Sequence, residues 1–467
     1  MVFSSINFLY YFLPLTLIIY FITPNKLKNL VLLFISLIFY AYGEPIYIIL
    51  MIVSIVISYT FALLIEKTSN KKHQKLLLTL ALIIHLGMLG YFKYLDFFIT
   101  NINLLFTSNI NLINIALPIG ISFYTFQSIS YIVDVYKNET KAIKNIITLA
   151  TYIALFPQLV AGPIIKLKTI EKELKERKST FNDISIGIRK FIIGLSKKVI
   201  LANSLGLVIE IFLKYENKTF LFYWIYAICF TMQIYLDFSG YSDMAIGLGK
   251  MFGFNFPENF NYPFIAKSIT DFWRKWHISL GSWFKEYLYI PLGGNKTSKL
   301  KWVRNILIVW MLTGLWHGAS WNFIIWGLFF AIILLIEKVF LIKYLKKIPE
   351  IITRFYVLII IIISFIIFNA TDLNMLIMDL FSLFGINNLP FSDNITFYYL
   401  KSSLVLIIIS IIATTPFMKN IIIKMKTNNK INKFINIMEP IFLLILLIIS
   451  TAYLVDSTFN PFIYFRF

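Results

Sequence analysis

The chain has 467 residues, of which 59% are hydrophobic, 18% aromatic and only 14% charged. Soluble proteins carry about 25% charged residues, and a water-soluble fold could not bury so much apolar surface, so the composition predicts an integral membrane protein. The net charge is +20, but the lysines and arginines stand in short clusters between apolar runs, which is typical of cytoplasmic loops that contact lipid headgroups and does not favour nucleic-acid binding.

Apolar runs recur along the whole chain with no glycine- and serine-rich linker. This predicts an all-α, polytopic fold in a single integral membrane domain, residues 1–467. Several of the runs are shorter than the ~20 residues of a full crossing, so some should be re-entrant or interfacial. No internal repeat is visible, which argues against a classical transporter. The predicted spans lie near residues 5–23, 30–43, 46–65, 76–98, 116–136, 146–165, 188–212, 219–236, 302–316, 318–337, 351–369, 398–415 and 437–455.

Polar residues interrupt the fifth of these runs at residues 117–128, which include Gln127. Gln158, Gly162 and Pro163 break the next run. Proline and glycine at membrane depth leave backbone groups without a hydrogen-bond partner in the helix, and other groups must then supply one. Two interpretations explain this composition. The segment could form the wall of a polar tunnel, or it could be a kinked helix whose free backbone groups form hydrogen bonds with neighbouring helices.

Residues 237–301 differ from both ends of the chain, because they are aromatic, glycine-punctuated and charged. We expect short tilted helices that line a cavity here, since irregular backbone at membrane depth is tolerated only inside protein or beside water. Asp237 ends an apolar run, and its carboxylate could either orient a histidine or pair with Arg274 or Lys275.

His277 follows the charged and aromatic segment DFWRKW. Drawn as one helix, residues 272–284 place their aromatic side chains on one face, which is typical of an interfacial amphipathic helix. On that interpretation His277 lies at the level of the lipid headgroups. The alternative is a functional histidine.

His317 stands in the segment LTGLWHGASW, with apolar residues on both sides and a natural break at Gly318. An ionisable side chain at that depth is a functional-site hypothesis by default. Imidazole can take a proton from a hydroxyl near neutral pH. The alternative is a histidine that is hydrogen-bonded inside the helix bundle.

Some motifs are absent from the sequence. It has no paired histidines with a carboxylate and no cysteine cluster, so no metal site is predicted. It also lacks a glycine-rich phosphate loop and a Gly-x-Ser-x-Gly turn, which argues against ATP-driven transport and against a hydrolase-type serine nucleophile.

Three segments together resemble the membrane-bound O-acyltransferase (MBOAT) family: YLDFSGYSDMAIGLG, DFWRKWHISLGSWFKEYLYIPLGGNK and LTGLWHGASWNFIIWG. The resemblance is strongest to the bacterial branch that O-acetylates alginate and other polysaccharides, and weaker to the teichoic acid D-alanylation proteins. The opening FSSINFLYYFLP and residues 453–467 also resemble that branch. The resemblance implies about 11 transmembrane helices, with short re-entrant helices, around a central funnel or tunnel, and a catalytic core at roughly 116–337.

The resemblance also implies roles for the two histidines. His317 would be the catalytic residue, and His277 the second signature histidine of the family. The residues expected to bind the donor or line the tunnel are Asp237, Ser239, Tyr241, Trp273, Arg274, Trp316 and Gln127.

By the same resemblance, the chain would be a membrane acetyltransferase of a bacterial cell membrane. The donor substrate would be acetyl-CoA, a cytosolic thioester, with no bound cofactor. The acceptor would be an extracellular or cell-wall polysaccharide, often reached through an exported SGNH-type acetyltransferase. Membrane lipid would be a further partner, and no nucleic acid would be bound. A transporter or flippase, and a scaffold for an exported acetyltransferase, are the alternatives.

Overall fold

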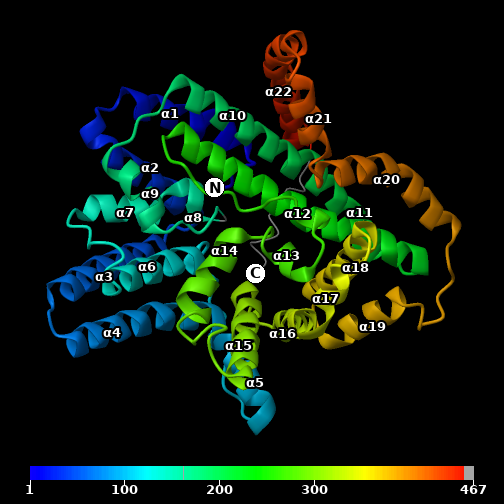
Figure 1. Cartoon of the computed structure of the whole chain (residues 1–467), viewed down its shortest axis with the longest axis horizontal. Coiled ribbons are helices and arrows are strands. Elements are labelled where there is room, and N and C mark those ends of the chain that lie inside the picture. The colour runs from blue at the N-terminus through cyan, green and yellow to red at the C-terminus, as the bar shows by residue number, and fades with distance from the viewer. Residues whose placement is uncertain (161, 457–467) are drawn as a thin grey trace. The chain divides into compact units, whose positions relative to one another are not determined.

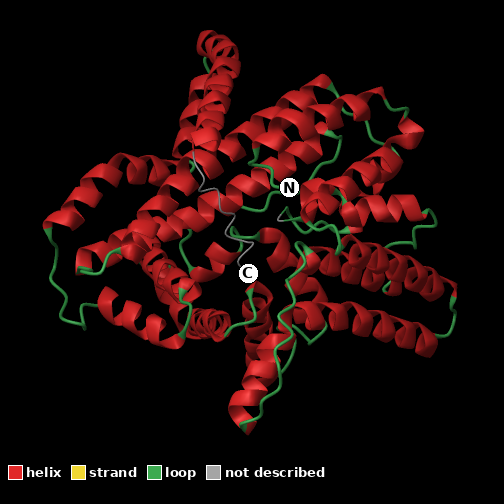
Figure 2. Ribbon diagram, turned by 180° about the vertical axis from the view of Figure 1, so that it is seen from behind, coloured by secondary structure: helices red, strands yellow, loops and turns green. Residues whose placement is uncertain are grey.

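The computed structural model describes residues 1–160 and 162–456, and every regular element in this part of the chain is a helix (Figure 2). The chain forms two compact units. The first comprises Met1–Phe191 and Met244–Pro257, and the second comprises Ile192–Asp243 and the chain from Glu258 onward. Helices α10 and α12 each run from one unit into the other.

The first unit contains the helices up to most of α10. Within it α3, α4 and α6 pack against one another (Figure 1). His85 on α4 is buried there between Ser54 and Ser58 of α3, with its two ring nitrogens 3.3 and 3.2 Å from their hydroxyls. The bounds are η1 Asn7–Phe12, α1 Leu13–Ile22, η2 Asn25–Leu27, α2 Lys28–Gly43, α3 Ile48–Lys67, α4 Lys71–Leu89, η3 Gly90–Tyr94, α5 Leu95–Phe106, α6 Ile121–Tyr136, α7 Ile146–Ala154, α8 Phe156–Leu159, α9 Leu167–Lys175 and α10 Phe181–Ser196.

The second unit has an aromatic core in which α11, α12, α16 and α18 take part. Phe212 of α11 stacks on Tyr226 of α12, with ring centroids 4.3 Å apart. The bounds are η4 Lys197–Ala202, α11 Asn203–Lys214, α12 Phe220–Met251, η5 Pro263–Ile265, α13 Ile269–Trp273, α14 Ile278–Phe284, η6 Lys285–Tyr289, α15 Lys299–His317, α16 Trp321–Ile336, η7 Glu337–Leu341, α17 Ile342–Leu345, α18 Glu350–Asn369, α19 Leu373–Leu383, α20 Asn394–Ala413, α21 Phe417–Lys426 and α22 Asn429–Asp456.

Nine helices in the described residues are long and apolar enough to cross a membrane, and two shorter apolar helices accompany them. The all-α, polytopic membrane fold is therefore confirmed. Among the longest candidate spans, α22 leaves most of its large apolar side chains exposed, as a helix that faces lipid does.

Two predicted boundaries are wrong. A single span over residues 146–165 does not form, because α7 ends at Ala154 and the short α8 carries Pro157 in its first turn. Residues 237–251 do not form short helices either, since α12 continues without a break to Met251. This helix can pass close to its neighbours because it carries small residues: a Cβ on Gly240 would lie 2.6 Å from the carbonyl oxygen of Gly194.

Helices α15 and α16 form a tight antiparallel pair in which glycine lets the two backbones meet. A Cβ on Gly314 would lie 2.1 Å from the carbonyl oxygen of Phe323, and a Cβ on Gly327 would lie 2.2 Å from that of Trp310. Glycine packing of this kind is common between membrane helices. The contact holds the end of α15, and with it His317, against α16.

Replacing Gly314 with alanine should therefore force the two helices apart and lower the free energy of unfolding by about 1–3 kcal/mol. Thermal unfolding in detergent would measure the change. Gly87→Ala on α4 is a matched control, because a Cβ at that position would have no neighbouring atom within 4 Å and alanine favours a helix. Equal melting temperatures for the two variants would contradict the close contact.

Candidate active site

His277 lies at a sharp turn between two short helices. Helix α13 ends at Trp273, α14 begins at Ile278, and His277 between them has φ 44° and ψ 55°. The interpretation of this segment as a single amphipathic helix is thus wrong, and its histidine is buried, at 2% exposed. His277 lies outside the candidate spans, and burial lowers the pKa of its imidazole to about 3, which favours the neutral ring.

A buried carboxylate, that of Glu337, holds the start of α13, the short helix that precedes this turn. Glu337, the first residue of η7, accepts hydrogen bonds from the backbone N–H groups of Ile269 and Thr270 at 2.6 and 2.8 Å, and from the Thr270 hydroxyl at 2.6 Å. A carboxylate at a helix N-terminus satisfies donors that have no partner within the helix. Glu337 therefore fixes the start of the segment that carries Arg274 and His277.

His317 is the last residue of α15, and the chain then turns at Gly318, which has an extended backbone. The break predicted at Gly318 is confirmed. The ring of His317 is 6% exposed and meets Trp326 and Phe368 edge to face, with centroids 5.1 and 5.3 Å away. These aromatic contacts hold the imidazole in one orientation.

Trp316 links the two histidines. Its ring centroid lies 5.8 Å from that of His277 and 5.0 Å from that of His317. The indole is 4% exposed. The two signature histidines, 40 positions apart in sequence, therefore both contact one buried tryptophan.

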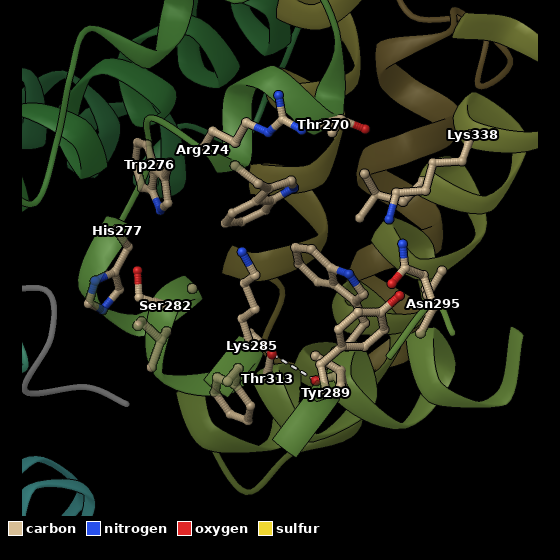
Figure 3. Close-up of a pocket in the computed structure, with 18 of the residues that line it drawn as sticks. Thr270, Arg274, Trp276, His277, Ser282, Lys285, Tyr289, Asn295, Thr313 and Lys338 are labelled. Atoms are coloured by element: carbon tan, nitrogen blue, oxygen red, sulfur yellow. Dashed lines mark hydrogen bonds between the residues drawn. The ribbon is translucent and has the colours of Figure 1, made fainter. Parts of the chain in front are cut away.

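Both histidines line a cavity of about 1060 Å³ in the second unit. One face of α15 forms much of its wall, because the lining residues Lys299, Trp302, Ile306, Val309, Trp310, Thr313 and His317 follow helical spacing. Those 18 steps of α-helix correspond to about 27 Å. In the close-up, His277 and Ser282 lie on one side of the pocket, Lys338 and Asn295 on the other, and Lys285 between them (Figure 3).

The pocket is strongly basic. Four cationic side chains line it, Arg274, Lys285, Lys299 and Lys338, and its lining within the described residues includes no aspartate or glutamate. All four are exposed, and the like charges of Arg274 and Lys338 lie close enough to repel each other. Lys299 begins α15 and Lys338 follows α16, so the antiparallel pair places both at the end away from His317. Clustered cations in a pocket whose described lining has no acidic side chain favour an anionic ligand.

The predicted site residues fall into three places. Trp273, Arg274, His277 and His317 line the pocket, and Trp316, which is not among the lining residues, contacts the rings of both histidines. Ser239 and Tyr241 are buried on α12 and are not among the lining residues. Gln127 belongs to the first unit, where its side chain is fully buried on α6 and its amide has no hydrogen-bond partner in the described part of the chain.

Asp237 has a partner that its own segment of sequence did not suggest. Its carboxylate lies 2.8 Å from the ammonium group of Lys198, and the two side chains are 2% and 1% exposed. Lys198 also donates to the side-chain oxygen of Asn203 at 3.0 Å. The carboxylate of Asp237 therefore pairs with Lys198, a partner that neither interpretation of the sequence named, and Lys275 pairs with Asp271.

Several residues of the site do not stand out in the sequence. Lys299 and Lys338 look like ordinary loop charges there, Lys285 lies in a quoted motif that indicates no role for it, and Asn259 lies in none of the motifs singled out. A signal existed for Lys198, because two adjacent lysines inside an apolar run require acidic partners at membrane depth, and Asp237 and Asp243 follow on the next span.

Comparison with known proteins agrees with this geometry. The family model described as MBOAT, membrane-bound O-acyltransferase family, matches residues 139–379, which is more than half of the chain and includes both histidines and the pocket's α13–α16. The chain belongs to the MBOAT family. It is accordingly an acyltransferase and a multi-pass protein of a bacterial cell membrane.

Among its MBOAT relatives are enzymes with several named acceptors. The chain is 41% identical to a probable alginate O-acetylase, AlgI, of Azotobacter vinelandii over 80% of this chain and 76% of the relative. It is 37% identical to a peptidoglycan O-acetyltransferase of Helicobacter pylori over 73% and 71% of the two chains. A teichoic acid D-alanyltransferase of Bacillus subtilis is 32% identical, over 47% of this chain and 59% of the relative.

Proposed function

We propose that this MBOAT protein transfers an acetyl group from acetyl-CoA, a cytosolic thioester, to a hydroxyl of an extracellular or cell-wall polysaccharide, with His317 as the general base. The observation that carries the proposal is the pocket itself. It combines two buried histidines at one end with four cations and no acidic side chain in its described lining.

The pocket's length and charge suit a donor of this kind. Coenzyme A carries several phosphate charges, and a flexible arm separates them from the thioester. The phosphates would bind Arg274, Lys299 and Lys338, and the thioester would reach His317 along the face of α15, over about 27 Å of helix. Because cytoplasmic ends of membrane helices are rich in lysine and arginine, the basic end would be the cytosolic one.

The chemistry is a direct displacement. The acceptor oxygen attacks the thioester carbonyl carbon while His317 removes the hydroxyl proton. The C–S bond then breaks, the CoA thiolate takes up that proton, and the products are an O-acetyl ester and CoA–SH. The described residues offer no activated nucleophile for a covalent route, since the one cysteine, Cys229, lies buried on α12 and outside the pocket.

The acceptor is assigned by class. The relatives' names refer to alginate and peptidoglycan as acetylated polymers, and both offer sugar hydroxyls outside the cytoplasm. An exported SGNH-type acetyltransferase would complete transfer where the polymer cannot reach the membrane.

Release of acetyl from labelled acetyl-CoA by the purified protein in vesicles tests the proposal. Donor turnover that depends on an added polysaccharide or exported partner is expected. If the vesicles instead translocate a separately labelled lipid-linked sugar without consuming the thioester, the protein is a flippase. If neither occurs, although glycan acetylation in cells needs the gene, it is a scaffold.

The basic end of the pocket makes a separate prediction. Replacing Arg274 and Lys338 together with glutamine should raise KM for acetyl-CoA by at least tenfold and change kcat little, because each charge-assisted contact to phosphate contributes about 1.5–3 kcal/mol to binding. Steady-state kinetics would measure both constants. Lys343→Gln is the matched control, since this lysine on α17 does not line the pocket. A fall in kcat with KM unchanged would contradict a phosphate-binding role.

A further inference from the structure

The backbone at His277 is in a conformation that non-glycine residues rarely adopt. Its φ of 44° and ψ of 55° lie in the left-handed region, where the side chain crowds the backbone. Such residues persist only where surrounding contacts impose the conformation, and they cluster at functional sites. The contacts around His277 must therefore hold it there.

Several of these contacts come from Asn259, 18 residues earlier in the chain and fully buried. Its backbone carbonyl accepts from the N–H of Ile278 at 2.9 Å. Its side-chain oxygen accepts from the N–H and the hydroxyl of Ser279 at 3.2 and 2.9 Å, and it lies 3.2 Å from Nδ1 of His277. One residue thus fixes both the turn and the ring.

These contacts determine which ring nitrogen carries the proton. The backbone N–H of Ser279 can only donate, so the atom of Asn259 that faces it must be the oxygen. That oxygen can only accept, so Nδ1 of His277 must be the protonated nitrogen. A neutral imidazole has a single N–H, which leaves a lone pair on Nε2.

Aromatic rings prevent the imidazole from turning over. Phe238 meets it edge to face at 4.7 Å, Phe260 lies nearly parallel to it at 6.5 Å, and Trp316 lies at 5.8 Å. Phe260 directly follows Asn259, so the same loop supplies the acceptor and one of the confining rings. A ring flip would place the Cδ2–H group against the oxygen of Asn259 and lose the hydrogen bond.

We infer that Asn259 is a positioning residue that locks His277 in the Nδ1–H tautomer, so that Nε2 serves as a hydrogen-bond acceptor for an N–H or O–H group of the substrate. This inference rests on the proposed acetyl transfer at the same pocket. It gives the two histidines different tasks: His317 removes the proton, and His277 orients a substrate donor group. It also excludes neutral His277 as the donor that stabilises the oxyanion.

The tautomer can be observed directly. The chain has only four histidines, so ¹⁵N-histidine labelling gives a small set of imidazole signals, and His277→Asn identifies the relevant pair. We expect Nδ1 protonated and Nε2 unprotonated in the wild type, and a mixture of both tautomers in Asn259→Ala. A wild-type His277 signal with the proton on Nε2 would overturn the inference, whether or not Asn259→Ala folds.

Kinetics supply the second readout. Asn259→Ala should lower kcat about 10–100-fold, as loss of a group that orients a histidine does, with little change in KM for acetyl-CoA. Asn259→Asp should recover most of that loss, because all three side-chain contacts are to an accepting oxygen and the Nδ2 group has no partner in the described residues. Equal activity of the alanine and aspartate variants would contradict the positioning role.

Asn145→Ala is the matched control. This asparagine caps α7 by accepting from the N–H groups of Ile147 and Thr148, and it does not line the pocket, so its loss should leave kcat unchanged. The two proposals fail separately. If His317→Ala retains full activity, the proposed function falls while the spectrum still decides the tautomer. If acetyl transfer occurs with the proton on Nε2, only the inference falls.

Discussion

Replacing His317 with alanine should lower acetyl transfer about 10²–10⁴-fold, the usual contribution of a general base, while the protein remains folded. The reason is geometric as well as chemical: the imidazole lies at the inner end of the pocket, where Trp326 and Phe368 hold its orientation. Release of CoA thiol from acetyl-CoA, normalised to the monodisperse fraction of each preparation, would measure the effect.

Two other histidines serve as controls for this experiment. His73 is exposed, and His85 is buried but bound to serines in the first unit. Neither lines the pocket, so folded His73→Ala and His85→Ala should keep the wild-type rate per molecule. Full activity of folded His317→Ala would show that another group accepts the proton.

The second large effect concerns stability. Asp237→Leu should lower the free energy of unfolding by about 3–5 kcal/mol, because it leaves the charge of Lys198 buried without its carboxylate. The double variant Asp237→Leu with Lys198→Met should regain most of that loss, since an apolar pair of similar volume replaces both charges. Thermal unfolding of all variants in one detergent would measure the cycle.

An exposed ion pair provides the comparison. Lys214 and Glu210 lie 2.6 Å apart on α11, but their side chains are 75% and 41% exposed. Exposed pairs contribute little, so Glu210→Gln should leave the melting temperature unchanged. If the double variant melts no higher than Asp237→Leu, removal of charge is not the cause of the instability.

Much of the fold could be predicted from the sequence, because apolar length alone identifies most membrane helices. The predicted spans near 46–65, 351–369 and 398–415 correspond to α3, α18 and α20 within a few residues. The turn at His277 could not be predicted in this way. Residues 272–284 have a helical pattern, and the contacts that break it come from Asn259, far outside the local segment.

The candidate site could likewise be predicted only in part, because distant contacts place some of its residues. His277, His317, Trp273 and Arg274 could be found because they stand in distinctive motifs, and the structure brings all four to one pocket. Lys338 could not, since nothing local distinguishes it from other lysines at the end of a span. Its position depends on the antiparallel packing of α15 and α16, which Gly314 and Gly327 make possible.

The paired charges of the second unit have a consequence for biogenesis. Lys197 and Lys198 lie in the π-helical turn between α10 and α11, and their carboxylate partners, Asp243 and Asp237, lie on α12. Each central lysine adds about 2.5–3.5 kcal/mol to the cost of inserting an isolated helix at the translocon. Insertion of the α10–α11 segment therefore costs less free energy if the segment remains beside the translocon until α12 has been synthesised. The two segments then enter the lipid together with their charges already neutralised.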